Sequence, residues 1–126
     1  MISGANKFLL GLAFALAPVA IAQAQTGTAA KGQAVFKQQC SICHSVGEPG
    51  VKPGPMMKGI VGRKAATVAG FKYSPALTKA GKTWTKAELD AFLAAPTKVV
   101  PGTFMVIPVP NPQTRADVIA YLETVK

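Results

Sequence analysis

Apolar residues near the end of the sequence recur at the spacing of one helix face. Val118, Leu122 and Val125 are four and three residues apart, and Ile119 widens the same stripe. Because an α-helix has about 3.6 residues per turn, these side chains all lie on one side. The pattern predicts a helix that begins near Pro112, runs to about Val125 and packs this stripe against the protein interior.

Residues 29–43 show a similar repeat. Gly32 and Phe36 are four residues apart, and Cys40 and Cys43 continue the same side at intervals of four and three. This spacing predicts one helix across the stretch. Because glycine has no Cβ, Gly32 would permit another helix to approach closely at that point.

Two shorter helices are indicated by their end signals. Residues 75–80 begin with proline and are followed by Gly81, a combination that predicts one short helix. Thr85 and Glu88 form a Thr-x-x-Glu capping box, which predicts the start of another helix. Pro96 should end that second helix, because the residue before a proline is driven out of the helical conformation.

The remaining segments are rich in glycine and proline. Residues 46–69 show no sustained period and indicate a loop with isolated turns. Four prolines between positions 99 and 112 require extended or turned backbone there. The sequence shows no strand pattern, internal repeat or second domain. The expected fold is therefore all-α, a few helices joined by long loops.

The first 24 residues have the pattern of a targeting segment. Lys7 supplies a positive charge, residues 8–22 are apolar, and Ala22-Gln23-Ala24 fits an A-x-A cleavage site. The apolar run is short for a membrane span, and a glycine and a proline interrupt it. The pattern predicts a signal peptide over 1–24 and one small domain over 25–126. The alternative is an uncleaved leader that anchors the protein to the membrane.

The stretch Cys40-Ser41-Ile42-Cys43-His44 carries the clearest chemistry in the chain. It has the C-x-x-C-H form of an attachment site for covalently bound c-type haem. Two thiols on about one helical turn suit thioether bonds to the two vinyl groups of one porphyrin, and His44 is placed to bind the iron. The motif uses both cysteines and the only histidine of the chain. No thiol or imidazole is left for other chemistry.

Three other interpretations of this motif fit less well. A thioredoxin-like dithiol needs flanking strands, which the sequence does not indicate. A structural zinc site needs four ligands, and two cysteines with one histidine supply only three. A disulfide between Cys40 and Cys43 would be strained and would leave His44 unexplained. An export leader also favours haem, because in the bacterial periplasm an unused cysteine pair would be oxidised.

The composition is strongly basic. The chain has 14 Lys and Arg against 5 Asp and Glu, a formal net charge of +9. Such a surface steers a protein toward acidic partners. Nucleic acid is not expected as a partner, because the lysines are scattered and a leader exports the chain.

A carrier of electrons needs a second axial ligand, so that the iron changes charge without binding anything else. With no second histidine, methionine is the next choice. Met105 follows the Pro101-Gly102 turn, which can lay a sulfur on the far face of a ring. Met56 and Met57 are the alternatives, although methionine more often fills gaps in a core.

Further motifs occur in a fixed order along the chain. They are Gly32 with Phe36, Gly54-Pro55, GIVGRKAA at 59–66, GFKYS at 70–74, TWT at 83–85, Leu89 to Pro96, VPGTFM at 100–105 and RADVIAYL at 115–122. Together with CSICH they resemble the class I cytochromes c, close to the mitochondrial type and its soluble bacterial relatives. The resemblance covers residues 29–126 and implies a few helices wrapped around one haem.

The same resemblance implies a role for each candidate site residue. Cys40 and Cys43 match the thioether cysteines, and His44 and Met105 match the two axial ligands. Pro55 matches the residue whose carbonyl accepts a hydrogen bond from the ligand histidine, a bond that fixes the ring. The residues that match donors to the haem propionates are Arg63, Tyr73 and Trp84.

Several positions depart from the family pattern. Phe92 stands where many relatives have a tyrosine near the methionine sulfur, and Leu77 stands where many have an asparagine. Phe104 replaces a lysine near the haem edge. The changes at Phe92 and Leu77 remove hydrogen-bond donors, so the resemblance implies a simpler polar network here, and Phe104 removes part of a basic rim.

The expected function is one-electron transfer by an exported, monomeric cytochrome c. It would shuttle electrons between respiratory or photosynthetic redox complexes, which are its expected partners. No acid–base pair or open coordination site points to an enzyme. The alternatives are a haem peroxidase or gas-sensing protein with a labile sixth ligand, and a haem-free dithiol oxidoreductase.

Overall fold

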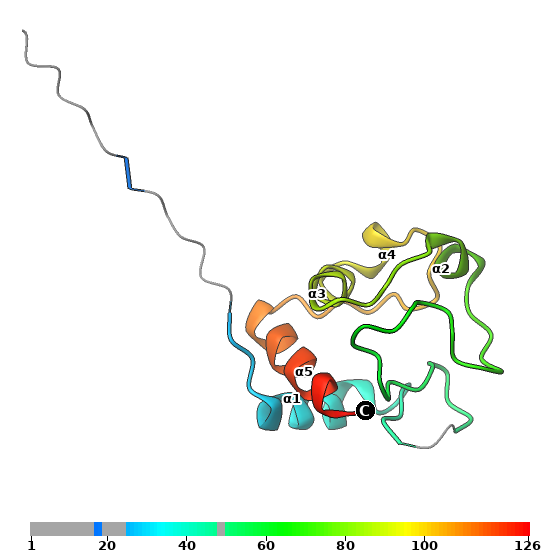
Figure 1. The fold of residues 1–126 in the computed structure, drawn as a ribbon, viewed down its shortest axis with the longest axis horizontal. Helices are drawn as coiled ribbons and strands as arrows, with labels where there is room; N and C mark the ends of the chain where they lie inside the picture. The colour runs from blue at the N-terminus through cyan, green and yellow to red at the C-terminus, as the bar shows by residue number, and fades with distance from the viewer. Residues whose placement is uncertain (1–16, 19–24, 48–49) are drawn as a thin grey trace, which may run out of the picture.

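In the part of the chain that the structure describes, the regular secondary structure is helical and long irregular segments join the helices. The computed structural model describes residues 17–18, 25–47 and 50–126, so the expected signal peptide lies almost wholly outside the described residues. The helices are α1 (Ala29–Val35), the π-helix η1 (Phe36–Cys40), α2 (Pro75–Ala80), α3 (Lys86–Ala94), α4 (Pro96–Val99) and α5 (Pro112–Thr124) (Figure 1). Between these helices the described chain forms no strand, only one isolated bridge between Lys64 and Thr83. The all-α prediction is confirmed.

The last helix forms where its apolar stripe predicts. Asn111 caps α5, because its side-chain oxygen accepts the backbone N–H of Thr114 at 2.9 Å. Val118, Ile119 and Leu122 are buried. The stripe therefore faces the interior, as its spacing predicts.

The first and last helices pack closely against each other, as Figure 1 shows for the cyan and red ends of the chain. Gly32 lies at the crossing, and a Cβ built on it would overlap the carbonyl oxygen of Asp117. The ring centroids of Phe36 and Tyr121 lie 5.7 Å apart beside this contact. Close approach at Gly32, expected from the sequence, is confirmed.

A hydrogen bond from Thr28, the residue before α1, to Asp117 in α5 also holds the two helices together. The backbone N–H of Thr28 donates to Oδ1 of Asp117 at 2.7 Å, and Nε2 of Gln113 donates to the same oxygen at 3.1 Å. Asp117 is buried, so these donors replace the water that its carboxylate would otherwise bind.

The expected helix over 29–43 does not continue as a regular α-helix. After Val35 the chain widens into the π-helix Phe36–Cys40, where the N–H of Ser41 donates to the carbonyl of Phe36 at 2.9 Å. The helix ends at Cys40, and the following residues form a turn. The prediction of one helix to position 43 is therefore wrong in its end and in its regularity, because an apolar spacing of four residues is compatible with an α turn and with a π turn.

The short helices match their end signals only in part. Ser74 caps α2 by accepting the N–H of Leu77 at 3.1 Å, and Gly81 ends it with φ of 60°. Thr85 accepts the N–H of Glu88 at 3.1 Å, as a capping box requires. The Glu88 carboxylate instead pairs with Lys82 at 2.8 Å, so only half of the box forms.

Pro96 ends α3 as predicted and at once begins α4, a single turn that the sequence pattern does not predict. Proline suits the first position of a helix, where its missing N–H would have no helical partner. The chain from Val100 to Asn111 is then irregular, in agreement with its prolines.

The buried core joins the helices to the loops around them. Its buried hydrophobic residues are Phe36, Ile60, Trp84, Leu89, Phe92, Val100, Val118, Ile119 and Leu122. The ring centroids of Trp84 and Phe92 lie 5.0 Å apart. None of the helices in the described part of the chain has the length and apolar character that a membrane crossing requires.

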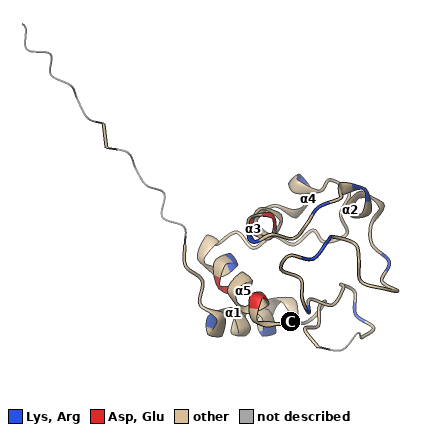
Figure 2. Ribbon diagram, in the orientation of Figure 1, with Lys and Arg blue, Asp and Glu red and all other residues tan. Residues whose placement is uncertain are grey.

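Basic and acidic residues are distributed differently over the part of the fold that the structure describes. Basic residues occur on helices and loops alike, whereas the acidic residues drawn in red lie on α3 and α5 (Figure 2). The scattered lysines expected from the sequence are therefore not gathered on one helix.

Candidate functional site

One cavity of about 260 Å³ brings together residues from almost every part of the domain. All eight candidate site residues line it: Cys40, Cys43, His44, Pro55, Arg63, Tyr73, Trp84 and Met105. Much of the remaining lining is apolar, including Phe36, Leu77, Phe92 and Ile107. The cavity is thus an apolar space with a few polar side chains at selected points, as ligand sites generally are.

The ring of His44 is held in one orientation by the loop that follows it. Its Nδ1 lies 2.7 Å from the carbonyl oxygen of Pro55. A carbonyl oxygen only accepts, so Nδ1 carries the hydrogen and Nε2 keeps a lone pair for a metal ion. Burial lowers the pKa of His44, the bond to Pro55 raises it, and the charge of Lys52 lowers it. The net lowering favours the neutral ring that a ligand must be.

Gly54 keeps this loop against the histidine. Its backbone N–H donates to the carbonyl of Cys43 at 2.7 Å. A Cβ built on Gly54 would lie 2.6 Å from Nδ1 of His44. The sequence gives Gly54 only as part of a Gly-Pro motif, and its contact with the ring is the reason for the glycine.

The two cysteines of the motif are half-buried and are not joined in a disulfide. Burial raises the pKa of Cys40, and the neighbouring Cys43 raises it further. In the described part of the chain no three His, Cys, Asp or Glu side chains converge on a common point. Cys40, Cys43 and His44 instead share the wall of the cavity.

The structure separates the three candidate methionines. Met105 and Met57 line the cavity, and Met56 does not. The backbone N–H of Met57 donates to the carbonyl of Ser45 at 2.7 Å, so Met57 is tied to the chain next to His44. Met57 thus comes from the segment that is bonded beside His44, whereas Met105 reaches the cavity from a separate segment.

The expected propionate donors bond to the protein backbone at the cavity. The guanidinium of Arg63 donates to the carbonyls of Lys58 at 2.8 Å and Met56 at 2.9 Å. The hydroxyl oxygen of Tyr73 accepts the N–H of Val68 at 3.1 Å and keeps its own hydrogen to donate. The structure places both residues, with Trp84, at the cavity wall.

Three side chains beside Met105 are largely exposed. Phe104 is 68%, Val106 61% and Ile107 69% exposed, and all three line the cavity. We also find Thr103 buried at this wall, a residue that the sequence gives only as part of the VPGTFM motif.

The residues present fit a haem c. Two thiols three positions apart, an imidazole with an available Nε2 and a thioether line one apolar cavity. Arg63 and Tyr73 bring polar side chains to the wall of a cavity that is otherwise lined mostly by carbon. This donor set suits a flat apolar ring with two thioether links, two axial ligands and acidic side groups.

Comparisons with known proteins agree on one family. The family model described as cytochrome c matches residues 29–126. Cytochrome c2 of Rhodomicrobium vannielii is 52% identical over 101 residues, which cover 78% of this chain and 79% of the relative. Cytochrome c2 of Rhodopila globiformis is 42% identical over 104 residues, which cover 82% of this chain and 98% of the relative.

A solved structure extends the likeness to three dimensions. Cytochrome cH from Methylobacterium extorquens aligns with a TM-score of 0.71 and 46% sequence identity, covering 78% of this chain and 99% of that protein. The family match runs from α1 to the end of α5 and includes every residue that lines the cavity. This chain therefore belongs to the cytochrome c family and has the class I cytochrome c fold.

Proposed function

We propose that this protein carries single electrons with one covalently attached haem c. The observation that carries the proposal is the gathering of both cysteines, the only histidine and Met105 around one apolar cavity. Cys40 and Cys43 would hold the haem through thioether bonds, and His44 and Met105 would be its axial ligands. When bound, the haem supplies an iron that gains and loses one electron.

The residues around the cavity would tune this site and close it to water. Pro55 fixes the His44 ring, and a histidine that donates to a carbonyl is a more basic ligand. Arg63, Tyr73 and Trp84 would donate to the haem propionates, which need hydrogen-bond partners when buried. Phe92 and Leu77 line the cavity with carbon and offer no hydroxyl or amide near the methionine.

Electron transfer is favoured over the peroxidase and gas-sensor alternatives. The relatives named above are cytochromes c2 and cytochrome cH, which supports a role as an electron carrier. We infer that the protein has no enzymatic turnover of its own, because Met105 would fill the position at which a peroxidase binds its substrate.

The partners would be an electron donor and an electron acceptor, which we take to be larger, membrane-bound redox complexes. The net charge of +9 of the full chain, which becomes 13 − 5 = +8 when Lys7 is removed with the leader, would steer the protein toward acidic surfaces. Close contact would use the exposed side chains at the cavity mouth, of which Phe104 is 68% exposed. The protein would act as a monomer.

We infer further that residues 1–24 are a cleaved signal peptide and that the mature protein works in the periplasm. The support is the A-x-A pattern after a short apolar run. Intact mass of the exported protein decides between the alternatives. A mass that begins after Ala24 supports export and cleavage, whereas a mass that retains Met1, found in the membrane fraction, supports an anchored carrier.

The function itself is tested by spectroscopy and redox titration of the purified protein. We expect colour that resists acid–acetone extraction, one reversible one-electron wave and a sulfur-to-iron charge-transfer band in the ferric protein. Haem that is extracted by acid–acetone would contradict attachment through Cys40 and Cys43. Ready binding of carbon monoxide by the wild type would instead favour the gas-sensor alternative.

A further inference from the structure

The segment that carries Met105 packs against the buried core through Met105, but its hydrogen bonds to the rest of the protein lie only on either side of it. Among the described residues, no hydrogen bond involves residues 104–107. Before this stretch, the N–H of Thr103 donates to the carbonyl of Val100 at 3.0 Å. After it, the N–H of Val109 donates to the carbonyl of Leu93, in α3, at 2.7 Å. Apart from the packing of its own side chain, Met105 is therefore held in place by these two flanking attachments.

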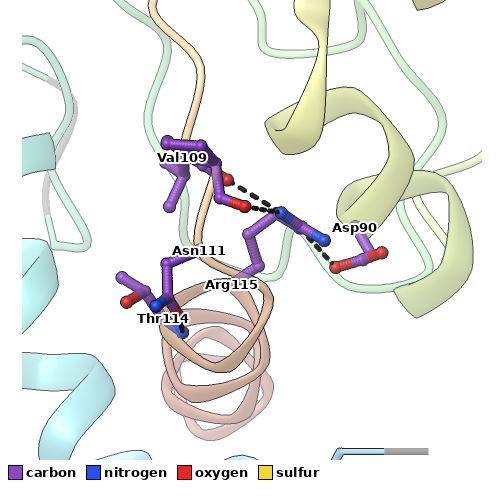
Figure 3. Close-up of polar contacts among 6 residues, drawn as sticks. Asp90, Val109, Asn111, Thr114 and Arg115 are labelled. Carbon is purple, nitrogen blue, oxygen red and sulfur yellow. Dashed lines mark hydrogen bonds and ion pairs between the residues drawn. The ribbon is translucent and has the colours of Figure 1, made fainter.

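Arg115 adds further hydrogen bonds to the second attachment, at Val109 and Pro110. Its Nη1 donates to the carbonyls of Val109 at 2.9 Å and Pro110 at 2.8 Å. Its Nε donates to Oδ1 of Asp90, in α3, at 2.7 Å. Figure 3 shows the guanidinium reaching from the beginning of α5 to the loop carbonyls on one side and to Asp90 on the other.

The guanidinium is suited to this position by its shape as well as by its charge. Its side chain is 11% exposed, so its bonds to the loop compete little with water. Hydrogen bonds from an ionised donor are about twice as strong as neutral ones. A lysine could not reach a carboxylate and two carbonyls in fixed directions, because its ammonium lacks the planar fork.

We infer that Arg115 is a positioning residue for Met105, with Asp90 orienting its guanidinium. By fixing the loop at Val109 and Pro110, Arg115 would keep the methionine sulfur at the iron and so exclude other ligands. This inference rests on the proposed role of Met105 as an axial ligand. Asp90 contributes less, because it is 48% exposed and exposed ion pairs contribute little energy by themselves.

The chain offers two matched controls in the same pair of helices. Lys86 and Glu123 form another ion pair between α3 and α5, at 3.1 Å, without any bond to the loop. Ile119 is buried in α5 and does not line the cavity, so Ile119→Val lowers overall stability by losing one methyl group. Neither Ile119→Val nor a substitution of Glu123 removes a bond to Val109.

The test is imidazole binding to the ferric, haem-loaded protein, because imidazole reaches the iron only when Met105 has left it. Affinity then rises with the open fraction, and we expect Arg115→Gln to bind imidazole about tenfold more tightly. Asp90→Asn should fall between Arg115→Gln and wild type. Glu123→Gln and Ile119→Val should remain within about twofold of wild type. The charge-transfer band of Arg115→Gln should also disappear well below the temperature of global unfolding.

Each contrary result has a separate meaning. If Arg115→Gln binds imidazole no more tightly than Ile119→Val, Arg115 is structural and the inference is wrong. If Arg115→Gln does not accumulate, Asp90→Asn takes its place in the test. An imidazole affinity of Asp90→Asn equal to that of Glu123→Gln then overturns the inference. If the wild type lacks the charge-transfer band, or Met105→Ala leaves imidazole binding unchanged, the ligand assignment is wrong and the inference falls with it.

Discussion

The ring of His44 and the backbone of Gly54 lie so close together that no side chain fits between them. A Cβ at residue 54 would lie 2.6 Å from Nδ1, the atom that faces the carbonyl of Pro55. The glycine and the hydrogen bond are therefore two parts of one arrangement. Any side chain at position 54 must move either the loop or the ring.

We expect Gly54→Ala to weaken the hydrogen bond between His44 and Pro55. Forcing a methyl group into this contact should lower the free energy of unfolding by about 1–3 kcal/mol. The redox potential should rise, because a histidine that donates less strongly is a less basic ligand and supports ferric iron less. Redox titration and denaturant unfolding measure the two effects. Gly50→Ala is the control, because nothing lies within 4 Å of its Cβ; equal behaviour of the two variants would contradict the prediction.

Met105→Ala should leave the haem covalently attached and open the sixth position of the iron. The ferric charge-transfer band should be lost, the potential should fall, and carbon monoxide binding and peroxidase activity should appear, because the thioether favours ferrous iron and blocks access. Met57→Ala is the matched comparison, since Met57 also lines the cavity. The assignment of Met105 is wrong if Met57→Ala produces these changes and Met105→Ala does not.

Gly32→Ala should separate the first and last helices. In an isolated helix this change would stabilise by up to about 1 kcal/mol. Here the added methyl group would overlap the carbonyl of Asp117, so we expect a loss of about 3 kcal/mol or more. Thermal and denaturant unfolding of the haem-loaded protein measure it. Gly47→Ala, with open space around its Cβ, should be close to neutral; a stabilised Gly32→Ala would mean that the helices do not cross at this point.

The contact between Asp117 and Thr28 should make stability depend on pH. The N–H of Thr28 lowers the pKa of Asp117, burial opposes this, and Gln113 and Lys31 lower it further. A carboxyl with a lowered folded pKa adds stability above its unfolded pKa, about 3.9, and loses that contribution as pH falls through the folded value. Asp117→Asn should therefore be less stable than wild type at neutral pH, with a difference that shrinks in acid. Unfolding curves across this pH range test the prediction. A stability difference that does not change with pH would mean that the charge of Asp117 does not stabilise the fold.

The sequence predicts those parts of the fold that depend on local spacing or on end residues. The stripe of Val118, Ile119 and Leu122 predicts α5, and Pro75 with Gly81 predicts α2. It does not predict the π-helical turn, because an apolar spacing of four residues lies between the periods of the α-helix and the π-helix and is compatible with both. The second half of the capping box fails at Glu88 because Lys82, which precedes the cap residue Thr85 in the chain, takes the carboxylate.

For the site, the sequence identifies which residue types can bind a cofactor better than it identifies which residues contact one another. The C-x-x-C-H motif marks the attachment residues by their types, and the family resemblance supplies Pro55, Arg63, Tyr73 and Trp84. The bonds of Arg115 to Val109 and Pro110 are not visible in the sequence, since they join a side chain to backbone carbonyls whose positions only the fold defines. Gly54 is similar, because the ring beside it is ten residues away in the chain.

The π-helical turn at Phe36–Cys40 also determines how this part of the protein tolerates insertions and deletions. A loop absorbs a change of one residue, whereas in a helix such a change rotates every side chain that follows. A π turn holds one residue more than an α turn for the same advance along the axis. A homologue that is one residue shorter between the glycine of the helix crossing and the first haem cysteine should therefore have a regular α turn here. A change of one residue in this stretch would convert one turn between the π and α forms, and the cysteine would stay at the cavity.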